Sequence, residues 1–429
     1  MRNKHRLINV LHRGIACLCF LALLLTGVGF ASSPAGTQSF AYVTNFDDDT
    51  VSVIDAATNA VVDTVPVGAS PYEVAITPDG AKAYVTNWGS DNVSVIDTDA
   101  NTVVDTVLGV SGPRGVAITP DGTTAYVANS KSGVAVIDTA SNTVVDTVPV
   151  VGQPYAVAIT PDGTRAYVVI FFPGTVAVID TETNTVVATV PVGASPYEVA
   201  ITPDGARAYV PNWGSDNVSV IDTDTNTVVA NIPVEDGPVG VAITPDGAWA
   251  YVPNFNDSTV SVIDTATNTV VDTVLGVSRP HGVAITPDGT RAYVTNSNSD
   301  TVSVIDTATN TVVATVVVGS RPQRVAITTL DPPDPPDPRT PEEQMEAIID
   351  EVESLVDTGV LNQGQGNALI AKLEQAERRL NKENTKTACN VLQAFINQVE
   401  AFIKTGRLPK AEGQSLIEAA PSVISQLCG

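Results

Sequence analysis

Short apolar runs separated by turn residues recur from residue 40 to residue 328, in seven copies of a unit of about forty-two residues. Each copy contains versions of VAITPDG, AYVTN, VSVID and TNTVV. The runs are rich in Val, Ile, Thr and Tyr, which is typical of β-strands. A repeat period of this length is typical of solenoids, propellers and arrays of small units.

Turn residues divide each unit into four strands. The segment Thr77-Pro-Asp-Gly80 has Pro at the second position and Gly at the fourth position of a type I turn. Asn101, between VSVID and TVV, suits the left-handed conformation of a tight turn. Because Val and Ile are nearly continuous, we expect the sheets to be buried on both faces. Four-stranded antiparallel sheets that stack around an axis form a β-propeller.

The two ends of the repeat region complement each other. The first unit begins at Ala41–Asn45 and has no VAIT strand of its own, whereas Val325–Thr328 is left over after the last unit. Pairing this strand with the first unit completes seven blades and covers sheet edges that would otherwise be free. We therefore predict an all-β, seven-bladed propeller over residues 40–330.

The repeat motifs resemble a known family. AYVTN, VAITPDG and VSVID are similar to the YVTN β-propeller repeats of exported and surface-layer proteins from bacteria and archaea. The resemblance covers all seven units, but the fourth reads Ala166-Tyr-Val-Val-Ile170, lacks the Asn and continues into Phe171 and Phe172. It implies the fold and leaves the activity open, because one fold supports many functions.

The N-terminal segment has the pattern of a signal peptide. Basic residues precede the apolar run Ile15–Val28, and small residues at Gly29 and Ala31 predict cleavage after Ala31. An uncleaved membrane anchor would need a longer apolar run. Residues 32–39 then form a short leader, and we expect the mature protein to be secreted or at the cell surface, with the periplasm as an alternative.

The sequence after the repeats changes character twice. Residues 331–340 are rich in Pro and Asp, which predicts a stiff linker. From residue 341 to 429 the strand-forming residues give way to Glu, Gln, Leu, Ala and Lys. This region predicts about four amphipathic helices, near Glu342–Asp357, Gly366–Leu380, Thr385–Lys404 and Lys410–Leu427. The segment Ala394–Val399, followed by Gly406 and Ala419, resembles the FIMAH domain that ends many secreted bacterial proteins.

Charge and cysteine content narrow the choice of partners. The chain carries 22 Lys and Arg against 47 Asp and Glu. Removal of the signal peptide makes the net charge more negative, because this segment contains Lys and Arg but no Asp or Glu. Such an acidic surface argues against nucleic acid and anionic lipid as partners. It favours cations or basic protein patches, or simply keeps the protein dissolved. Cys389 and Cys428 alone remain after cleavage, so we predict a disulfide between them.

Candidate binding residues lie where the repeats differ. In a four-stranded blade, the loops after AYVxN and the connections before VAIT share one face of the disk, and both vary between units. Aromatic residues with a few Arg and Glu at a channel mouth suit protein or carbohydrate binding. Alternatively, the same residues only pack the blade tops and plug the channel. The candidates are Phe46, Tyr72, Glu73, Trp88, Arg114, Tyr155, Phe171, Phe172, Tyr197, Glu198, Trp213, Phe255, His281 and Arg324.

Metal binding and catalysis have weaker signals. His281 is the one histidine of the mature chain, so no cofactor or His-rich metal centre is predicted. The segment Asp97-x-Asp99-x-Asn101 resembles the start of a calcium loop but lacks the distal Glu, and calcium is only weakly supported. Some propellers that resemble this one are lactonases or lyases, and His281 with Glu73 or Glu198 imitates their sites.

Copies within the chain favour a binding function over catalysis. The block Gly68–Asp99 recurs almost unchanged at Gly193–Asp224. Repeated surfaces suit multivalent contact, whereas enzyme sites need different residues that converge on one point. The sequence therefore predicts a secreted or cell-surface scaffold whose variable propeller face recognises a protein or a glycan. An extracytoplasmic lactonase or lyase and a structural surface-layer component remain the alternatives.

Overall fold

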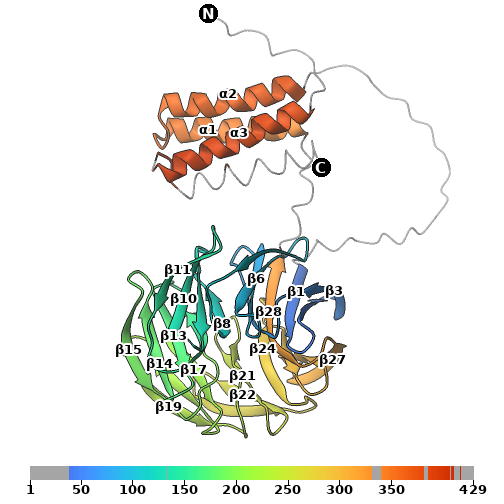
Figure 1. The fold of residues 1–429 in the computed structure, drawn as a ribbon. Coiled ribbons are helices and arrows are strands. Elements are labelled where there is room, and N and C mark those ends of the chain that lie inside the picture. Colours follow the sequence, from blue (N-terminus) through green and yellow to red (C-terminus); the bar gives the residue numbers. More distant parts are fainter. Residues whose placement is uncertain are drawn as a thin grey trace, which may run out of the picture. The chain divides into compact units, whose positions relative to one another are not determined.

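The computed structural model describes residues 38–131, 133–330, 340–380, 385–405, 407–409 and 416. Seven four-stranded antiparallel sheets form the blades of a propeller, and three helices follow it in the chain (Figure 1). This confirms the predicted fold class. The predicted signal peptide and nearly all of the leader and linker lie outside the described residues.

The four strands of each blade follow one another from the central channel outwards. The innermost strands are β4 (Pro71–Ile76), β8 (Pro113–Ile118), β12 (Pro154–Ile159), β16 (Ala200–Ile201), β20 (Ala242–Ile243), β24 (Pro280–Ile285) and β28 (Pro322–Leu330). The second strands are β1 (Gln38–Asn45), β5 (Lys82–Asn87), β9 (Thr124–Asn129), β13 (Arg165–Ile170), β17 (Arg207–Asn212), β21 (Trp249–Asn254) and β25 (Arg291–Asn296).

The third and fourth strands complete the blades toward the rim. The third strands are β2 (Thr50–Asp55), β6 (Asn92–Asp97), β10 (Gly133–Asp138), β14 (Thr175–Asp180), β18 (Asn217–Asp222), β22 (Thr259–Asp264) and β26 (Thr301–Asp306). The outermost strands are β3 (Ala60–Pro66), β7 (Thr102–Val107), β11 (Thr143–Val148), β15 (Thr185–Pro191), β19 (Thr227–Pro233), β23 (Thr269–Val274) and β27 (Thr311–Val317).

The first blade is built from both ends of the propeller sequence. Strand β28 pairs antiparallel with β1, so that Phe40 lies opposite Thr328 and Val43 opposite Val325. The predicted closure by the leftover VAIT strand is therefore confirmed. The first blade also packs against the last, because Ala41 shares a buried apolar cluster with Tyr293.

Alternation along the second strand explains how neighbouring blades pack. Successive side chains of a strand point to opposite faces of its sheet. In the first blade, Tyr42 packs with Ala83 and Val85 of the next blade, whereas Ala41 and Val43 pack toward the preceding one. The repeat thus supplies a large residue on one face and small residues on the other, so the blades fit together around the ring.

Each buried tyrosine also reaches the next blade through its hydroxyl group. The Tyr hydroxyl donates a hydrogen bond of 2.6–2.9 Å to an Asn Oδ1 in the turn before the next outer strand. Every one of these Asn residues has a positive φ of 50–54°. The pairs are Tyr42–Asn101, Tyr84–Asn142, Tyr126–Asn184, Tyr167–Asn226, Tyr209–Asn268, Tyr251–Asn310 and Tyr293–Asn59.

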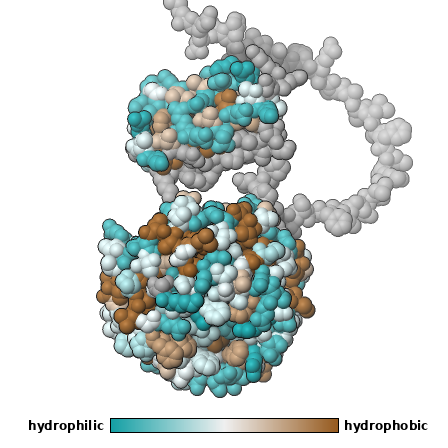
Figure 2. Space-filling view, viewed as in Figure 1, coloured by the Kyte–Doolittle hydropathy of each residue, from teal (hydrophilic) through white to brown (hydrophobic). Residues whose placement is uncertain are grey.

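Burial differs between the strands of a blade. The second and third strands are almost wholly buried, as their continuous Val and Ile predict. The outer strands are not buried. In β7 all residues before Val107 are exposed, and Val104 is 55% exposed to solvent. The expectation of burial on both faces is therefore wrong for the outer strands, because no element of the described residues covers them. Apolar side chains consequently remain on the propeller surface (Figure 2).

The C-terminal region contains helices α1 (Pro341–Asp357), α2 (Gln363–Leu380) and α3 (Thr385–Lys404). Their apolar faces form one buried cluster that includes Val352, Leu369 and Phe395. Most of the predicted fourth helix lies outside the described residues, although Leu416 is helical and buried in the same cluster. None of the described helices is long and apolar enough to cross a membrane.

Cys389 in α3 is disulfide-bonded. Its predicted partner, Cys428, lies outside the described residues, so the pairing stays a prediction.

Candidate functional site

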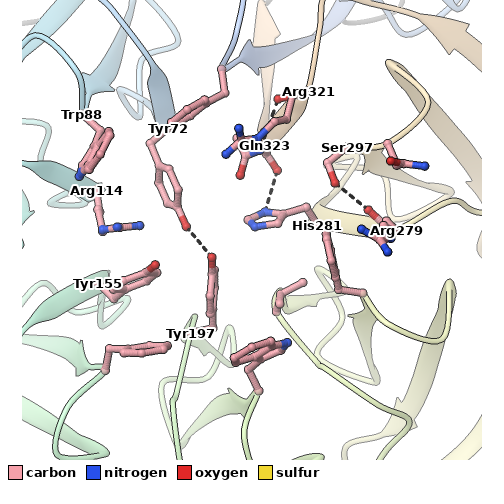
Figure 3. A pocket seen from close by; sticks show the side chains of 16 residues that line it. Tyr72, Trp88, Arg114, Tyr155, Tyr197, Arg279, His281, Ser297, Arg321 and Gln323 are labelled. Atoms are coloured by element: carbon pink, nitrogen blue, oxygen red, sulfur yellow. Dashed lines mark hydrogen bonds between the residues drawn. The ribbon is translucent and has the colours of Figure 1, made fainter.

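A cavity of about 770 Å³ lies at one end of the propeller, where residues from all seven blades meet (Figure 3). Each inner segment begins with a proline, and the residue after this proline lines the cavity in every blade. These residues are Tyr72, Arg114, Tyr155, Tyr197, Val239, His281 and Gln323. The prolines start the inner strands themselves, as Pro71 does in β4. Most of the candidates that we expected just before the inner strands, such as Tyr72, therefore lie inside these strands.

A second group of lining residues comes from the loops after the second strands. They are Phe46, Trp88, Phe171, Trp213, Phe255, Ser297 and Asn298. Ten of the predicted candidates therefore surround one cavity, as expected if the two kinds of variable loop share a face. Phe172 is not in the lining, but its ring contacts Phe171 at 4.8 Å and 63% of its surface is exposed.

Aromatic side chains fill the floor of this cavity. The Tyr72 hydroxyl donates a hydrogen bond of 3.1 Å to the Tyr197 hydroxyl, although the two residues lie in different blades (Figure 3). The Tyr155 ring lies against Tyr197 at 4.8 Å and stacks on Phe171 at 5.0 Å. Burial raises the pKa of Tyr72 well above its usual value, so its hydroxyl stays protonated. The rings of Tyr72, Tyr155 and Tyr197 thus contact one another across the blades at the floor of the cavity.

A charged cluster lies one residue further along the inner strands. Arg324 is 4% exposed, and its Nη2 lies 2.7 Å from Glu198 Oε2 while its Nε lies 3.3 Å from Glu73 Oε2. Its Nη1 donates to the backbone carbonyls of Val239 and His281. Arg324 therefore connects blades on different sides of the channel. Of the four charged candidates, Arg114 lines the cavity, whereas Glu73, Glu198 and Arg324 do not and lie beneath it.

The protonation of this cluster follows from its burial. Burial and, to a smaller extent, the nearby Glu198 raise the pKa of Glu73 to about 8, although Arg324 lowers it in part. Burial also raises the pKa of Glu198. One guanidinium balances one carboxylate, so at neutral pH we assign the proton to Glu73, the more distant partner. The cluster is then uncharged in sum, which lowers the cost of burying it.

Small residues in the neighbouring strands leave room for Arg324. At the equivalent position the other blades carry Gly115, Ala156, Gly240 and Gly282. A Cβ atom on Gly282 would lie 2.8 Å from Arg324 Cα and 2.6 Å from the Gln323 carbonyl oxygen. A side chain there would therefore push β24 and β28 apart.

His281 is held as a neutral, buried ring. It is 5% exposed, and its Nδ1 lies 3.2 Å from the backbone carbonyl of Gln323. Burial lowers its pKa well below the usual value, and the charge of Arg324 lowers it further. Among the described residues His281 makes no hydrogen bond or ion pair with Glu73 or Glu198. The pairing that the lactonase or lyase hypothesis requires is thus not formed.

Two arginines at the cavity rim were not among the candidates. Arg279 and Arg321 each precede the proline of an inner strand and have positive φ values of 44° and 53°. The Arg279 guanidinium lies 5.4 Å from the centre of the Phe255 ring, and that of Arg321 lies 4.4 Å from Phe46. The signal in the sequence was the repeated Ser-Arg-Pro triplet, because the other units carry Ser, Gly or Gln before this proline.

The calcium-loop resemblance is explained by turn geometry. Asp97 Oδ1 accepts a hydrogen bond from the Ala100 amide at 2.9 Å, and Asp222 holds Thr225 in the same way. These carboxylates therefore close the turn before each outer strand. In the described part of the chain, no group of three His, Cys, Asp or Glu residues is placed to hold a metal ion.

Family comparisons agree with this architecture. A YNCE-like β-propeller model matches residues 7–132, a choice-of-anchor I domain model matches residues 145–342, and a FIMAH domain model matches residues 345–425. A β-propeller followed by a FIMAH domain, as predicted from the repeats and the C-terminal helices, is therefore confirmed. The finer assignment to YVTN repeats rests on the repeat motifs. The choice-of-anchor match points to an extracellular or cell-surface protein.

Solved structures show the same fold in proteins of different activity. Hydrazine synthase from Kuenenia stuttgartiensis is 28% identical, with a TM-score of 0.57 over 62% of this chain and 92% of that one. A protein of unknown function from Desulfotomaculum acetoxidans is 20% identical, with a TM-score of 0.61 over 68% and 99%. The dihydro-heme d1 dehydrogenase NirN, in complex with DHE, is 17% identical, with a TM-score of 0.53 over 67% and 74%. The search of curated proteins found no match.

Proposed function

We propose that this protein is a binding scaffold of the cell envelope, whose propeller recognises a protein or a glycan at the cavity described above. The observation that carries the proposal is the convergence of aromatic residues from many blades on one open cavity. A concave, mostly apolar cavity with a few polar groups is the usual form of a ligand site. The choice-of-anchor match supports a location at the envelope.

The polar groups of the site support binding more than catalysis. Glu73 and Glu198, the suggested catalytic partners of His281, instead form ion pairs with Arg324 beneath the aromatic floor. The floor tyrosines and His281 contact one another, with Tyr197 at 5.5 Å from the His281 ring. A preformed surface of this kind binds a ligand without rearrangement.

The three tryptophans allow a matched test. Trp88 and Trp213 lie in the cavity lining and are 39% and 41% exposed. Trp249 is 36% exposed and begins β21, at the opposite end of that strand from Phe255. Replacing any of them by Ala removes a similar exposed area, but only the first two changes alter the cavity.

The experiment is co-sedimentation of the purified full-length protein with cell-envelope fractions. We expect saturable binding that Trp88→Ala and Trp213→Ala weaken about tenfold each, the range of a moderate hot spot. Trp249→Ala should bind like the wild type, and thermal unfolding should show that all three variants fold. Equal binding by all variants would place recognition outside the cavity and contradict the proposal.

A further inference from the structure

The cavity is basic in a strongly acidic protein. Its lining includes Arg114, Arg279 and Arg321 and contains no Asp or Glu. The chain as a whole has a formal net charge of −25. Selective placement of arginine at one concave surface creates a local positive potential that attracts anions. Such a reversal of sign favours a negatively charged ligand.

Arg114 is the central feature of this basic surface. Its guanidinium lies 4.0 Å from the centre of the Tyr155 ring, 5.1 Å from Tyr72 and 5.8 Å from Trp88 (Figure 3). Its Nε is buried and has no hydrogen-bond partner, and no carboxylate of the described residues forms an ion pair with the side chain. Aromatic rings accept the faces of a guanidinium but leave the N–H groups at its edge unpaired.

Unpaired guanidinium donors at a cavity are suited to a carboxylate. The planar fork of arginine donates two parallel hydrogen bonds to the two oxygens of a carboxylate. The other arginines have different roles. Arg321 already pairs with Asp47 at 3.3 Å, and Arg279 lies over Phe255 at the rim. Arg114 is therefore the residue most available to a ligand, with the other two adding positive potential.

The surrounding aromatic rings favour a sugar as the carrier of the carboxylate. The C–H face of a pyranose ring packs on the negative face of an aromatic ring. Trp88 and Trp213 present partly exposed rings in the same cavity as Arg114. The cavity volume of about 770 Å³ lies within the usual range for small-ligand sites and is too small to seat a folded protein.

From this geometry we propose that the cavity binds a short stretch of acidic glycan, with Arg114 paired to a uronic-acid carboxylate and the tryptophans stacked on the sugar rings. This inference rests on the proposed binding function and specifies its ligand. It makes Arg114 the residue that distinguishes acidic from neutral glycans.

The test is calorimetric titration of the full-length protein with three uronate tetrasaccharides, of galacturonate, of mannuronate and of the glucuronate-containing hyaluronan repeat. Each is compared with its methyl ester, which keeps the sugar rings and removes the charge. We expect at least one uronate to bind, and its ester to bind at least tenfold more weakly. Arg114→Gln should cause a similar loss for the uronate and no loss for the ester.

Two controls separate this inference from other outcomes. Arg291→Gln removes the same charge at the start of β25, away from the cavity, and should leave the affinity unchanged. Thermal unfolding of Arg114→Gln checks that the aromatic floor still folds. Absence of binding by all three uronates, or equal binding of acid and ester, overturns the inference.

The alternative ligand is an acidic peptide, and a Glu-rich octapeptide serves as its probe. Tighter binding of this peptide than of any uronate would overturn the glycan assignment. Envelope binding that depends on Trp88 but shows no preference for uronates would leave the proposed function standing and reject only the inference. Loss of both would reject the two together.

Discussion

Arg324 and Glu198 form an ion pair of 2.7 Å between the strand that closes the propeller and a blade far from it in the sequence. Arg324 lies in β28, which completes the first blade, and Glu198 precedes β16 in another blade. The pair is buried beneath the aromatic floor of the cavity. It therefore joins the blade that β28 completes to a blade on another side of the channel, and it supports the floor on which a ligand would rest.

Removal of Arg324 should destabilise the propeller strongly. Arg324→Met leaves the buried Glu198 carboxylate without its counter-charge, and breaking such a pair costs about 3–5 kcal/mol. We expect a lower midpoint of thermal unfolding at pH 8. The triple variant Arg324→Met, Glu73→Gln, Glu198→Gln should recover most of the loss, because it leaves no unpaired charge. An unchanged midpoint in Arg324→Met would show that the cluster does not contribute to stability.

The repeats made the fold predictable to a large extent. Each unit carries its own strand and turn signals, so seven copies specify seven similar blades. The leftover strand at Val325–Thr328 even predicted how the ring closes. The outer strands were the exception, since TVV has the same apolar composition as buried strands. Only the position of a strand in the blade shows that Val104 faces solvent.

The candidate site was predictable in its residues and not in its contacts. Variation between copies pointed to Tyr72 and Tyr197, but their hydrogen bond joins residues 125 positions apart. Glu73 and Arg324 appeared as surface candidates, whereas the structure places them in a buried cluster. Contacts across a channel depend on which blades face each other, and the sequence pattern within one repeat does not predict which blades do so. Arg279 was missed because its left-handed backbone directs it to the rim.

The Asn residue of each inter-blade pair should show two separable contributions to stability. Asn59 has a φ of 54° and accepts the Tyr293 hydroxyl at 2.9 Å. Asn59→Gly keeps the backbone conformation and loses the hydrogen bond, at a cost of about 1 kcal/mol. Asn59→Ala adds strain of about 1–2 kcal/mol at a positive φ. We expect denaturant unfolding to rank wild type above Gly and Gly above Ala.

A repeat in the middle of the chain provides the control for this prediction. Asn184 has a φ of 53° and accepts the Tyr126 hydroxyl at 2.7 Å. Its Gly and Ala variants should show the same ranking, because the geometry is the same away from the closure. Equal costs of Gly and Ala at both positions would contradict the role assigned to the left-handed turn.

The C-terminal domain should contain one disulfide between Cys389 and Cys428. Cys389 is disulfide-bonded, and Cys428 is the other cysteine outside the predicted signal peptide. Intact mass of the secreted protein should increase by two hydrogens on reduction. In the chain-entropy model the bond stabilises this domain by about 4 kcal/mol, so Cys389→Ser should lower its unfolding midpoint. Two free thiols in the secreted protein would contradict the prediction.

The raised pKa of Glu73 should make stability fall as the pH rises. A carboxyl group whose pKa is about 8 in the folded state and 4.5 when unfolded favours folding fully below pH 4.5. This contribution disappears as the pH rises through 8, because the folded protein must then bury a charge. Glu73→Gln imitates the protonated state, so it should match the wild type at pH 5 and exceed it at pH 9. We expect a difference of about 2 kcal/mol, since relaxation reduces the full effect of about 1.36 kcal/mol per pKa unit.

Comparison of these two proteins separates Glu73, together with the coupled Glu198, from the other groups that titrate in the same range. The lowered pKa of His281 has the opposite effect, since a group held neutral loses stability as the pH falls below 6.5. That effect is common to both proteins and cancels in the difference. Asp91 and Asp105 have lowered pKa values and stay ionised above pH 5, so they add no slope. Thermal unfolding curves from pH 5 to pH 9 that run parallel for wild type and Glu73→Gln would show that Glu73 is charged throughout, and the proton would then have to be placed elsewhere in the cluster.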